Sequence, residues 1–202
     1  MAKPAPQVDN VMDNIPYYEK WQLGEGIPVI KTFFVQDLKK VELKPWDRTG
    51  GKGAFINMEG AEGTTGAYVL EIAPGKHTNP RRHLYEDLIF VLKGRGATTI
   101  WNDSGAKQTF EWQDGSLFAL PLNSSYQHFN GQGDESARFF SVNSMPIVFN
   151  LFHHADFIFN TPRDFTDRFN GEAEYFSGKG KAYPGRVWDT NFIADARNFK
   201  LE

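Results

Sequence analysis

The sequence predicts an all-β fold of the sandwich or barrel type. Between residues 67 and 142, short apolar segments are separated by turns rich in Gly, Asp and Asn at a spacing of roughly 8 to 12 residues. No segment with a helical period lies between these strands, which disfavours a parallel α/β fold. Aromatic residues make up 15% of the chain, with 18 Phe, and this content favours a β-rich core or an aromatic-lined cavity.

The expected strands follow one another through the middle of the chain, and the turn sequences PG, NDSG and QDG separate several of them. Strands are predicted at residues 67–75, 87–94, 97–101, 107–112, 116–121, 125–130 and 137–142. Ahead of them, the stretch KTFFVQDLKKVELKPW predicts short edge strands. The glycine-rich stretch that follows it predicts a loop with one short strand inside.

The chain is expected to have three parts. Residues 1–45 form an N-terminal arm, residues 46–150 the β-domain, and residues 151–202 an aromatic-rich extension that packs on the β-domain or on a partner subunit. Where the β-domain ends, Ser144 followed by Pro146 predicts the cap and first turn of a short helix.

Composition excludes several classes of function. The 202 residues carry a net charge of −3, so no basic surface for nucleic acid is expected. The absence of cysteine excludes disulfides, thiolate zinc sites and thiol nucleophiles. No apolar run approaches about 18 residues, and the N-terminal MAKPAPQVDN lacks the apolar region of a secretory signal. We therefore expect a cytoplasmic protein that binds neither nucleic acid nor membranes.

The stretch PGKHTNPRRHLYEDLIFVLKGRG, residues 74–96, concentrates the residues with chemical potential. His83 stands close to Asp87, and His128 lies on the strand at 125–130. Because side chains two apart on a strand share a face, Tyr126 accompanies His128 and Arg81 accompanies His83. Two histidines and a carboxylate from separate strands would form a facial triad suited to Fe(II) or Mn(II). The alternative is a His83–Asp87 pair beside surface arginines.

This stretch and DGSLFALPLNSSYQHFN resemble the two sequence motifs of the cupins. The first motif falls in register on Gly75, Arg81, His83, Asp87 and Gly94. The second falls on Gly115, Pro121, Asn123, Tyr126 and Asn130. The resemblance spans roughly Gly66 to Val142. It implies a single-domain cupin with a jelly-roll β-barrel, flanked by the arm and the helix-containing extension.

The chain departs from the cupin pattern at the metal ligands. Cupins usually hold a metal with two histidines and a glutamate from the first motif and a histidine from the second. Arg81 occupies the first histidine position and cannot ligate a metal. Asp87 occupies the glutamate position and Tyr126 the histidine position of the second motif, so only His83 keeps the family's residue.

The resemblance still implies one divalent transition metal, which would be Fe, Mn, Ni or Zn. Its predicted ligands are His83, His128 and a carboxylate. His128 is two residues past Tyr126 and shares its face. The carboxylate is Asp87, or Glu86 if a bulge shifts the corner by one residue. His77 is expected in a surface turn, with a third nitrogen ligand as the alternative. His153 and His154 are expected in packing or an oligomer contact.

Two functions follow from the resemblance. The first is a metal-dependent enzyme with oxygenase, isomerase or lyase chemistry on a small carboxylated or aromatic molecule, with Tyr126 as proton donor and Arg81 as anion clamp. The alternative is a metal-free protein that binds or senses a small molecule, in which Arg81 pairs with Asp87 or replaces the charge of the metal. A storage barrel is disfavoured, because storage cupins carry two sets of motifs. The resemblance also implies a homodimer.

Overall fold

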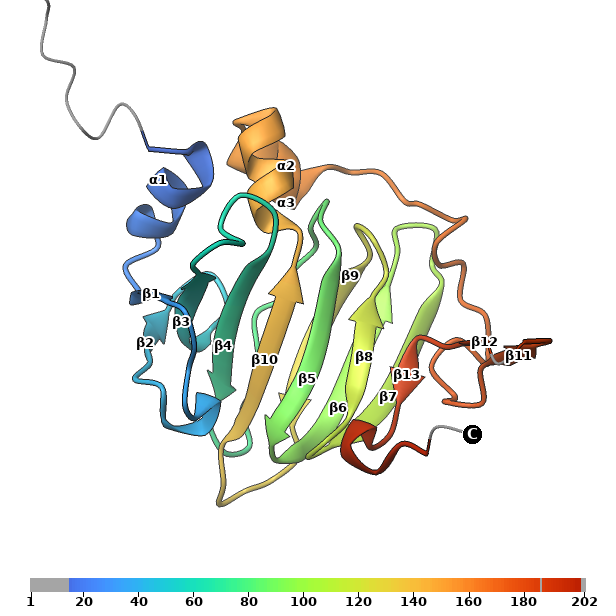
Figure 1. Ribbon diagram of the computed structural model, residues 1–202. Coiled ribbons are helices and arrows are strands. Elements are labelled where there is room, and N and C mark those ends of the chain that lie inside the picture. Colours follow the sequence, from blue (N-terminus) through green and yellow to red (C-terminus); the bar gives the residue numbers. More distant parts are fainter. Residues whose placement is uncertain (1–14, 186, 201–202) are drawn as a thin grey trace, which may run out of the picture.

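The computed structural model describes residues 15–185 and 187–200 (Figure 1). Most of the predicted N-terminal arm is included, but its first fourteen residues and the last two of the extension lie outside the described residues. None of the described helices is long and apolar enough to cross a membrane.

Two β-sheets stacked face to face form the body of the molecule (Figure 1). The strands of the larger sheet, in spatial order, are β1 (Val29–Thr32), β3 (Gly51–Met58), β4 (Gly66–Ile72), β10 (Ala137–Asn143), β5 (Asp87–Lys93), β8 (Leu117–Leu120) and β13 (Phe192–Ile193), with β2 (Lys44–Trp46) also paired to β3. The smaller sheet consists of β7 (Lys107–Gln113), β6 (Arg95–Trp101) and β9 (Ser125–Asn130). All pairs are antiparallel except β1 with β3.

The seven strands predicted between residues 67 and 142 are confirmed as β4 to β10. Their alternation of apolar and polar residues places one face of each strand in the core. Glycines at the predicted turns then redirect the chain. Gly94 alone joins β5 in the large sheet to β6 in the small one, with φ at 99°, a backbone conformation that favours glycine.

The prediction of an all-β fold with a jelly-roll β-barrel is confirmed in part, because the described sheets do not close into a barrel. Within the described residues the two sheets have no common strand pairing, so the fold is mostly β, cupin-like and open, with several helices. The described part of the chain contains three α-helices: α1 (Tyr17–Gly24), α2 (Met145–Phe152) and α3 (Ala155–Asn160). Two 3₁₀ turns (Leu38–Lys40, Ala196–Asn198) and a hairpin of β11 (Lys181–Tyr183) and β12 (Val187–Asp189) complete the described elements.

Sequence reasoning found one of these helices. Ser144 is the N-cap residue of α2 and a proline stands in its first turn, as predicted. The Ser144 hydroxyl does not cap the helix, however, because it accepts a hydrogen bond from the Glu86 backbone N–H at 3.0 Å. Helices α1 and α3 were not predicted, since each is short and has at most one acidic residue to mark its first turn.

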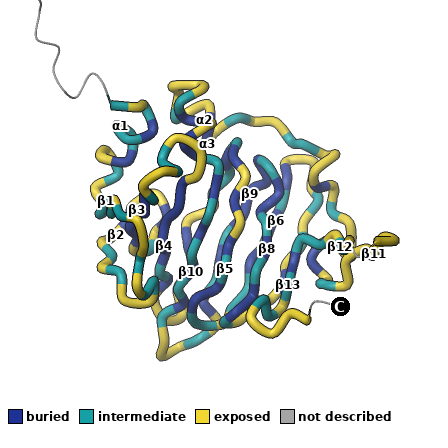
Figure 2. The backbone as a smooth tube through the Cα atoms, in the orientation of Figure 1, coloured by how far each residue is buried: buried dark blue, intermediate teal, exposed yellow. Residues whose placement is uncertain are grey.

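The core lies between the sheets and continues under the helices (Figure 2). Rings from both sheets interlock there, with Trp112 edge-on to Phe139 at 4.7 Å between ring centres. A second aromatic cluster joins the helices: Phe149 of α2 contacts Tyr18 and Trp21 of α1 and Phe159 of α3. The three helices therefore cover one end of the two-sheet body (Figure 1). The predicted domain limits at residues 45 and 150 stay predictions.

Candidate ligand site between the sheets

Two parts of the chain meet at the helix-covered end of the interior. The segment before β5 carries Arg81 and His83, and β9 carries Tyr126 and His128. Arg81 and Tyr126 exchange two backbone hydrogen bonds, at 3.0 Å and 2.7 Å, which join this segment to the small sheet. Four of the predicted site residues are thus brought together with Asp87, the first residue of β5.

Asp87 is buried and already has its hydrogen-bond partners. One carboxylate oxygen accepts from the Tyr68 hydroxyl at 2.8 Å, and the other accepts from the Ser141 hydroxyl. Burial raises the pKa of Asp87 to about 6, although both hydrogen bonds and the Arg81 charge oppose this shift. At neutral pH the carboxylate is therefore ionised and occupied by two neutral donors.

His83 is a neutral hydrogen-bond acceptor in this interior. Its Nδ1–H donates to the Tyr85 carbonyl oxygen at 2.9 Å, and its ring stacks on the Tyr85 ring with 3.7 Å between ring centres. Burial and then the Arg81 charge lower the pKa of His83 to about 3. The 3.7 Å contact between His83 Nε2 and Asp87 is therefore no ion pair at neutral pH.

His128 is also neutral, but it presents a donor. The Trp112 indole N–H donates to Thr98 Oγ1 at 2.9 Å, and Thr98 Oγ1 lies 2.7 Å from His128 Nδ1. The arrangement that uses every hydrogen has Thr98 donating to Nδ1, which leaves the His128 proton on Nε2. Burial, followed by the charge of Arg81, holds the pKa of His128 well below its ordinary value.

Arg81 supplies the positive charge of the site. Its guanidinium lies 5.1 Å from the centre of the Tyr126 ring, and its Nε and Nη2 atoms are buried. Among the described residues these two nitrogens have no hydrogen-bond partner, and Arg81 forms no ion pair with Asp87. The Tyr126 hydroxyl, whose pKa burial raises, is buried without a partner as well.

A small pocket opens beside these groups. Its walls combine the site residues with side chains from the helices: Trp21, Trp46, Arg48, Arg81, Arg82, His83, Tyr85, Tyr126, Met145 and Phe159. The pocket volume is about 10 Å³, close to the space that one water molecule needs. The Arg48 guanidinium covers it from outside, 4.4 Å from the centre of the Phe159 ring and held by Glu25 at 2.5 Å.

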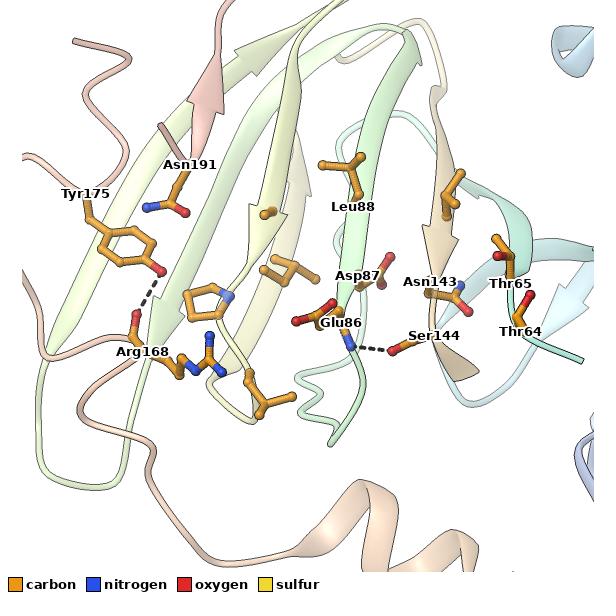
Figure 3. A pocket seen from close by; sticks show the side chains of 15 residues that line it. Thr64, Thr65, Glu86, Asp87, Leu88, Asn143, Ser144, Arg168, Tyr175 and Asn191 are labelled. Atoms are coloured by element: carbon orange, nitrogen blue, oxygen red, sulfur yellow. Dashed lines mark hydrogen bonds between the residues drawn. The ribbon is translucent and has the colours of Figure 1, made fainter. Parts of the chain in front are cut away.

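Two residues considered for the site lie elsewhere. Glu86 is exposed and lines a groove of about 470 Å³, which Asp87 also borders and which is distinct from the small pocket beside Arg81 (Figure 3). Glu86 directly precedes Asp87, the first residue of β5, and successive side chains on a strand point to opposite faces. Because Asp87 faces inward, Glu86 faces outward. His77 is exposed, as expected, with Nδ1 3.0 Å from the Gln127 side-chain amide.

The histidines of the extension have structural roles in this chain. His153 ends α2 in the left-handed conformation and stacks on Tyr17, with 5.1 Å between ring centres. His154 accepts a hydrogen bond from the Phe157 N–H at 3.0 Å and so caps α3. The predicted packing role is confirmed for His153.

Several site residues were missed by sequence reasoning. Tyr68 and Ser141 are opposite each other in the β4–β10 pairing, and together they hold Asp87. The alternation along each strand predicts that both side chains face the interior. The strand pairing that brings them to Asp87 could not be predicted from the sequence. Trp21 and Phe159 come from helices that were not predicted.

Comparison with known proteins identifies the family of this chain. A family model described as auxin binding protein matches residues 57–164, more than half of the chain and including strands β4 to β10. The chain belongs to the auxin-binding protein family. The predicted cupin resemblance is confirmed with it, since both sequence motifs fall inside the matched region.

Individual relatives of this family member are distant. Auxin-binding protein 4 of Zea mays is 25% identical over 120 residues, which are 56% of this chain and 59% of that protein. The chain thus spans about six-tenths of this relative's length.

Solved structures of cupins are similar over about half of the chain. The oxalate decarboxylase formate complex of Lactobacillus farciminis is 23% identical over 55% of this chain and 32% of its own, with a TM-score of 0.46. The Cnp3 cupin domain of Schizosaccharomyces pombe is 20% identical over 54% and 71%, with a TM-score of 0.44. At this level of similarity neither carries a function over to this chain.

The interior donors do not fit the divalent metal that the cupin resemblance implies. In the described part of the chain, no three His, Asp or Glu side chains are grouped to hold an ion. Glu86 faces outward, and the Thr98 hydrogen bond leaves a proton on the His128 nitrogen that faces inward. The Arg81 guanidinium beside His83 would also repel a second cation.

Proposed function

We propose that this protein binds a small aromatic carboxylic acid of the auxin type between its two sheets, under the helices. The observation that carries the proposal is a set of buried polar atoms that converge without partners among the described residues. These atoms are Arg81 Nε and Nη2, Tyr126 Oη, His83 Nε2 and His128 Nε2. Buried polar groups in native proteins are nearly always hydrogen-bonded, so a ligand is the natural partner for such a set.

The kinds of atoms define the ligand class. The guanidinium nitrogens and His128 Nε2–H can only donate, the Tyr126 hydroxyl can donate or accept, and His83 Nε2 can only accept. A site with more donors than acceptors and a fixed cation is complementary to an anion. The aromatic walls offer stacking surfaces for a ring. The family name and the name of the maize relative both support an auxin, which is an aromatic carboxylic acid.

Binding requires the helix-covered end to open. The pocket of about 10 Å³ has room for a water molecule but not for an indole ring. Trp21 and Phe159 come from the short helices α1 and α3, and their rings are only half-buried. We infer that these two side chains move aside when the ligand enters.

The comparisons favour this binding function over the metal-dependent oxygenase, isomerase or lyase. The roles of Tyr126 and Arg81 change accordingly, from proton donor and substrate clamp in catalysis to ligand-binding groups. The homodimer and the cytoplasmic location stay predictions.

A Tyr126→Phe variant tests the proposal. The Tyr126 hydroxyl is buried without a partner among the described residues. Its removal should therefore raise the free energy of unfolding of the unliganded protein by about 0 to 2 kcal/mol. The same change should weaken binding of indole-3-acetate about 3- to 10-fold, since one hydrogen bond is worth about 1 kcal/mol. Isothermal titration calorimetry and thermal melts measure both effects.

The exposed Glu86→Gln variant is the matched control and should bind like the wild type. Absence of any heat of binding or melting shift with millimolar indole-3-acetate would refute the proposed ligand class.

A further inference from the structure

We propose that Arg81 takes over the role of the missing metal, so that the site holds an ionised carboxylate through a guanidinium and needs no metal ion. This inference rests on the proposed function and names the group that recognises the ligand's charge. Its starting point is the disagreement described above: the chain has a cupin-like interior whose donors do not fit a divalent cation.

Arg81 is held as a rigid part of the site. The backbone N–H and carbonyl oxygen of Arg81 both form hydrogen bonds with the Tyr126 backbone. The Arg81 guanidinium lies over the Tyr126 ring. A side chain positioned in this way loses little further freedom when it binds a ligand. The positive charge therefore stands at a defined point, as a bound metal would.

The free edge of the Arg81 guanidinium is complementary in shape to a carboxylate. Nε–H and one Nη2–H point the same way along one edge of the group, and this pair can bind both oxygens of a carboxylate at once. These are the two Arg81 nitrogens that are buried without a partner. A lysine or a spherical ion would not offer this paired geometry.

The neighbouring Arg82 is a contrasting case in the same segment, because its guanidinium has hydrogen-bond partners within the protein. Its Nη1 and Nη2 bind the two carboxylate oxygens of Asp103 at 3.0 Å and 2.6 Å, and its Nε reaches the Ser125 hydroxyl at 3.2 Å. Among the residues that the structure describes, no carboxylate binds the Nε and Nη2 atoms of Arg81. Asp87, the acidic residue nearest to it in the site, is occupied by Tyr68 and Ser141.

Buried cationic donors without hydrogen-bond partners are costly, and a protein fold retains them where they have a use. The charge of ionised Asp87 is near Arg81, but its oxygens are occupied and make no hydrogen bond to Arg81. The buried Nε and Nη2 atoms beside two neutral histidines therefore fit a site that binds an external anion. The ligand class is thus a carboxylate in its ionised form, and the corresponding amide should bind poorly.

The experiment compares indole-3-acetate with indole-3-acetamide on the full chain, purified without a metal-affinity tag. We expect the wild type to prefer the acetate and to keep its affinity within about twofold after EDTA treatment, with no gain on addition of Zn²⁺ or Mn²⁺. An Arg81→Gln variant should lose roughly 10- to 100-fold in affinity for the acetate and little for the acetamide, so the preference disappears. An Arg81→Lys variant keeps the charge but lacks the paired N–H donors. Its affinity for the acetate should lie between those of the wild type and the Arg81→Gln variant.

The outcomes separate this inference from the proposed function. Acetate binding that EDTA abolishes and a metal restores overturns the role of Arg81 but leaves the binding function intact. Unchanged preference in a folded Arg81→Gln variant overturns it too. Failure of both ligands to bind the wild type refutes the proposed function itself. Should Arg81→Gln not fold, the wild-type EDTA and amide comparisons decide the question.

Discussion

Individual residues in the interior have opposite responses to pH. His83 is buried as a neutral ring, and its pKa is lowered from 6.5 to about 3 by burial and the Arg81 charge. Asp87 is buried as a carboxyl group, and burial raises its pKa from 3.8 to about 6. The neutral histidine stabilises the fold fully above its unfolded pKa and loses this contribution as the pH falls towards 3. The contribution of Asp87 is full below 3.8 and is lost as the pH rises through 6.

Between pH 6 and 4, acidification lowers the stability contributed by the two buried histidines and raises that contributed by Asp87. Since there are two histidines and one carboxyl group, we predict a net loss of stability on acidification. A His83→Asn variant keeps a donor near Tyr85 but cannot gain a proton. Its free energy of unfolding should depend less on pH, by about 1.4 kcal/mol per unit in this range. An Asp87→Asn variant should show the opposite change, a steeper dependence. Urea unfolding at a series of pH values measures both, and parallel curves for all three proteins would exclude this role for the buried groups.

At the scale of the elements, the turns that end β4 and β5 depend on glycine to different degrees. Gly75 and Gly94 are the two glycines that the first cupin-like motif contains, and both have positive φ, 63° and 99°. Gly75 lies in open space. A Cβ at Gly94 would stand 2.9 Å from Ala137 Cα, in the backbone of the neighbouring strand. One motif thus contains a turn glycine and a packing glycine.

We predict that Gly94→Ala lowers the free energy of unfolding by more than about 2 kcal/mol, because it adds a backbone clash to the strain of positive φ. Gly75→Ala should lower it by only about 1 to 2 kcal/mol, since the left-handed conformation is strained but the space is empty. Chemical denaturation compares the two variants directly. Equal losses would show that Ala137 moves aside without cost.

On the scale of the whole molecule, segments that precede and follow strands β4 to β10 together cover the site. Helix α1 precedes all the strands and helices α2 and α3 follow β10, yet the three helices lie together at one end of the molecule (Figure 1). Their aromatic side chains contact one another, and Trp21 and Phe159 line the pocket. Arg48 ties this cover to the body through Glu25. In this arrangement the cover leaves room for about one water molecule and would obstruct the proposed ligand.

A Phe159→Ala variant should therefore bind indole-3-acetate with a faster association rate, by several-fold, because part of the cover is removed. Phe157→Ala is the matched control, since Phe157 stands on the same helix α3 but is exposed and contacts Phe152 instead. Stopped-flow tryptophan fluorescence measures the rates. If both variants associate like the wild type, the ligand enters by another route.

The sequence by itself determined the strands and the register of the two motifs. Period-two alternation and turn glycines are local signals, so β4 to β10 and the alignment of Arg81, His83 and Asp87 could be predicted. It also indicated that an arginine stands where a metal ligand is expected. These features depend only on residues that are near one another in the chain.

Only the tertiary structure decided how the site works. Tyr68 and Ser141 reach Asp87 through pairings between distant strands, and the placement of Glu86 depends on a parity that one residue of slip would reverse. Helices α1 and α3, which bring Trp21 and Phe159 to the pocket, are too short to be recognised from their own sequences and are stabilised by packing on other elements. The balance of donors, acceptors and charge in the interior arises from such long-range contacts, and this balance points to a carboxylate held by Arg81 rather than to a metal.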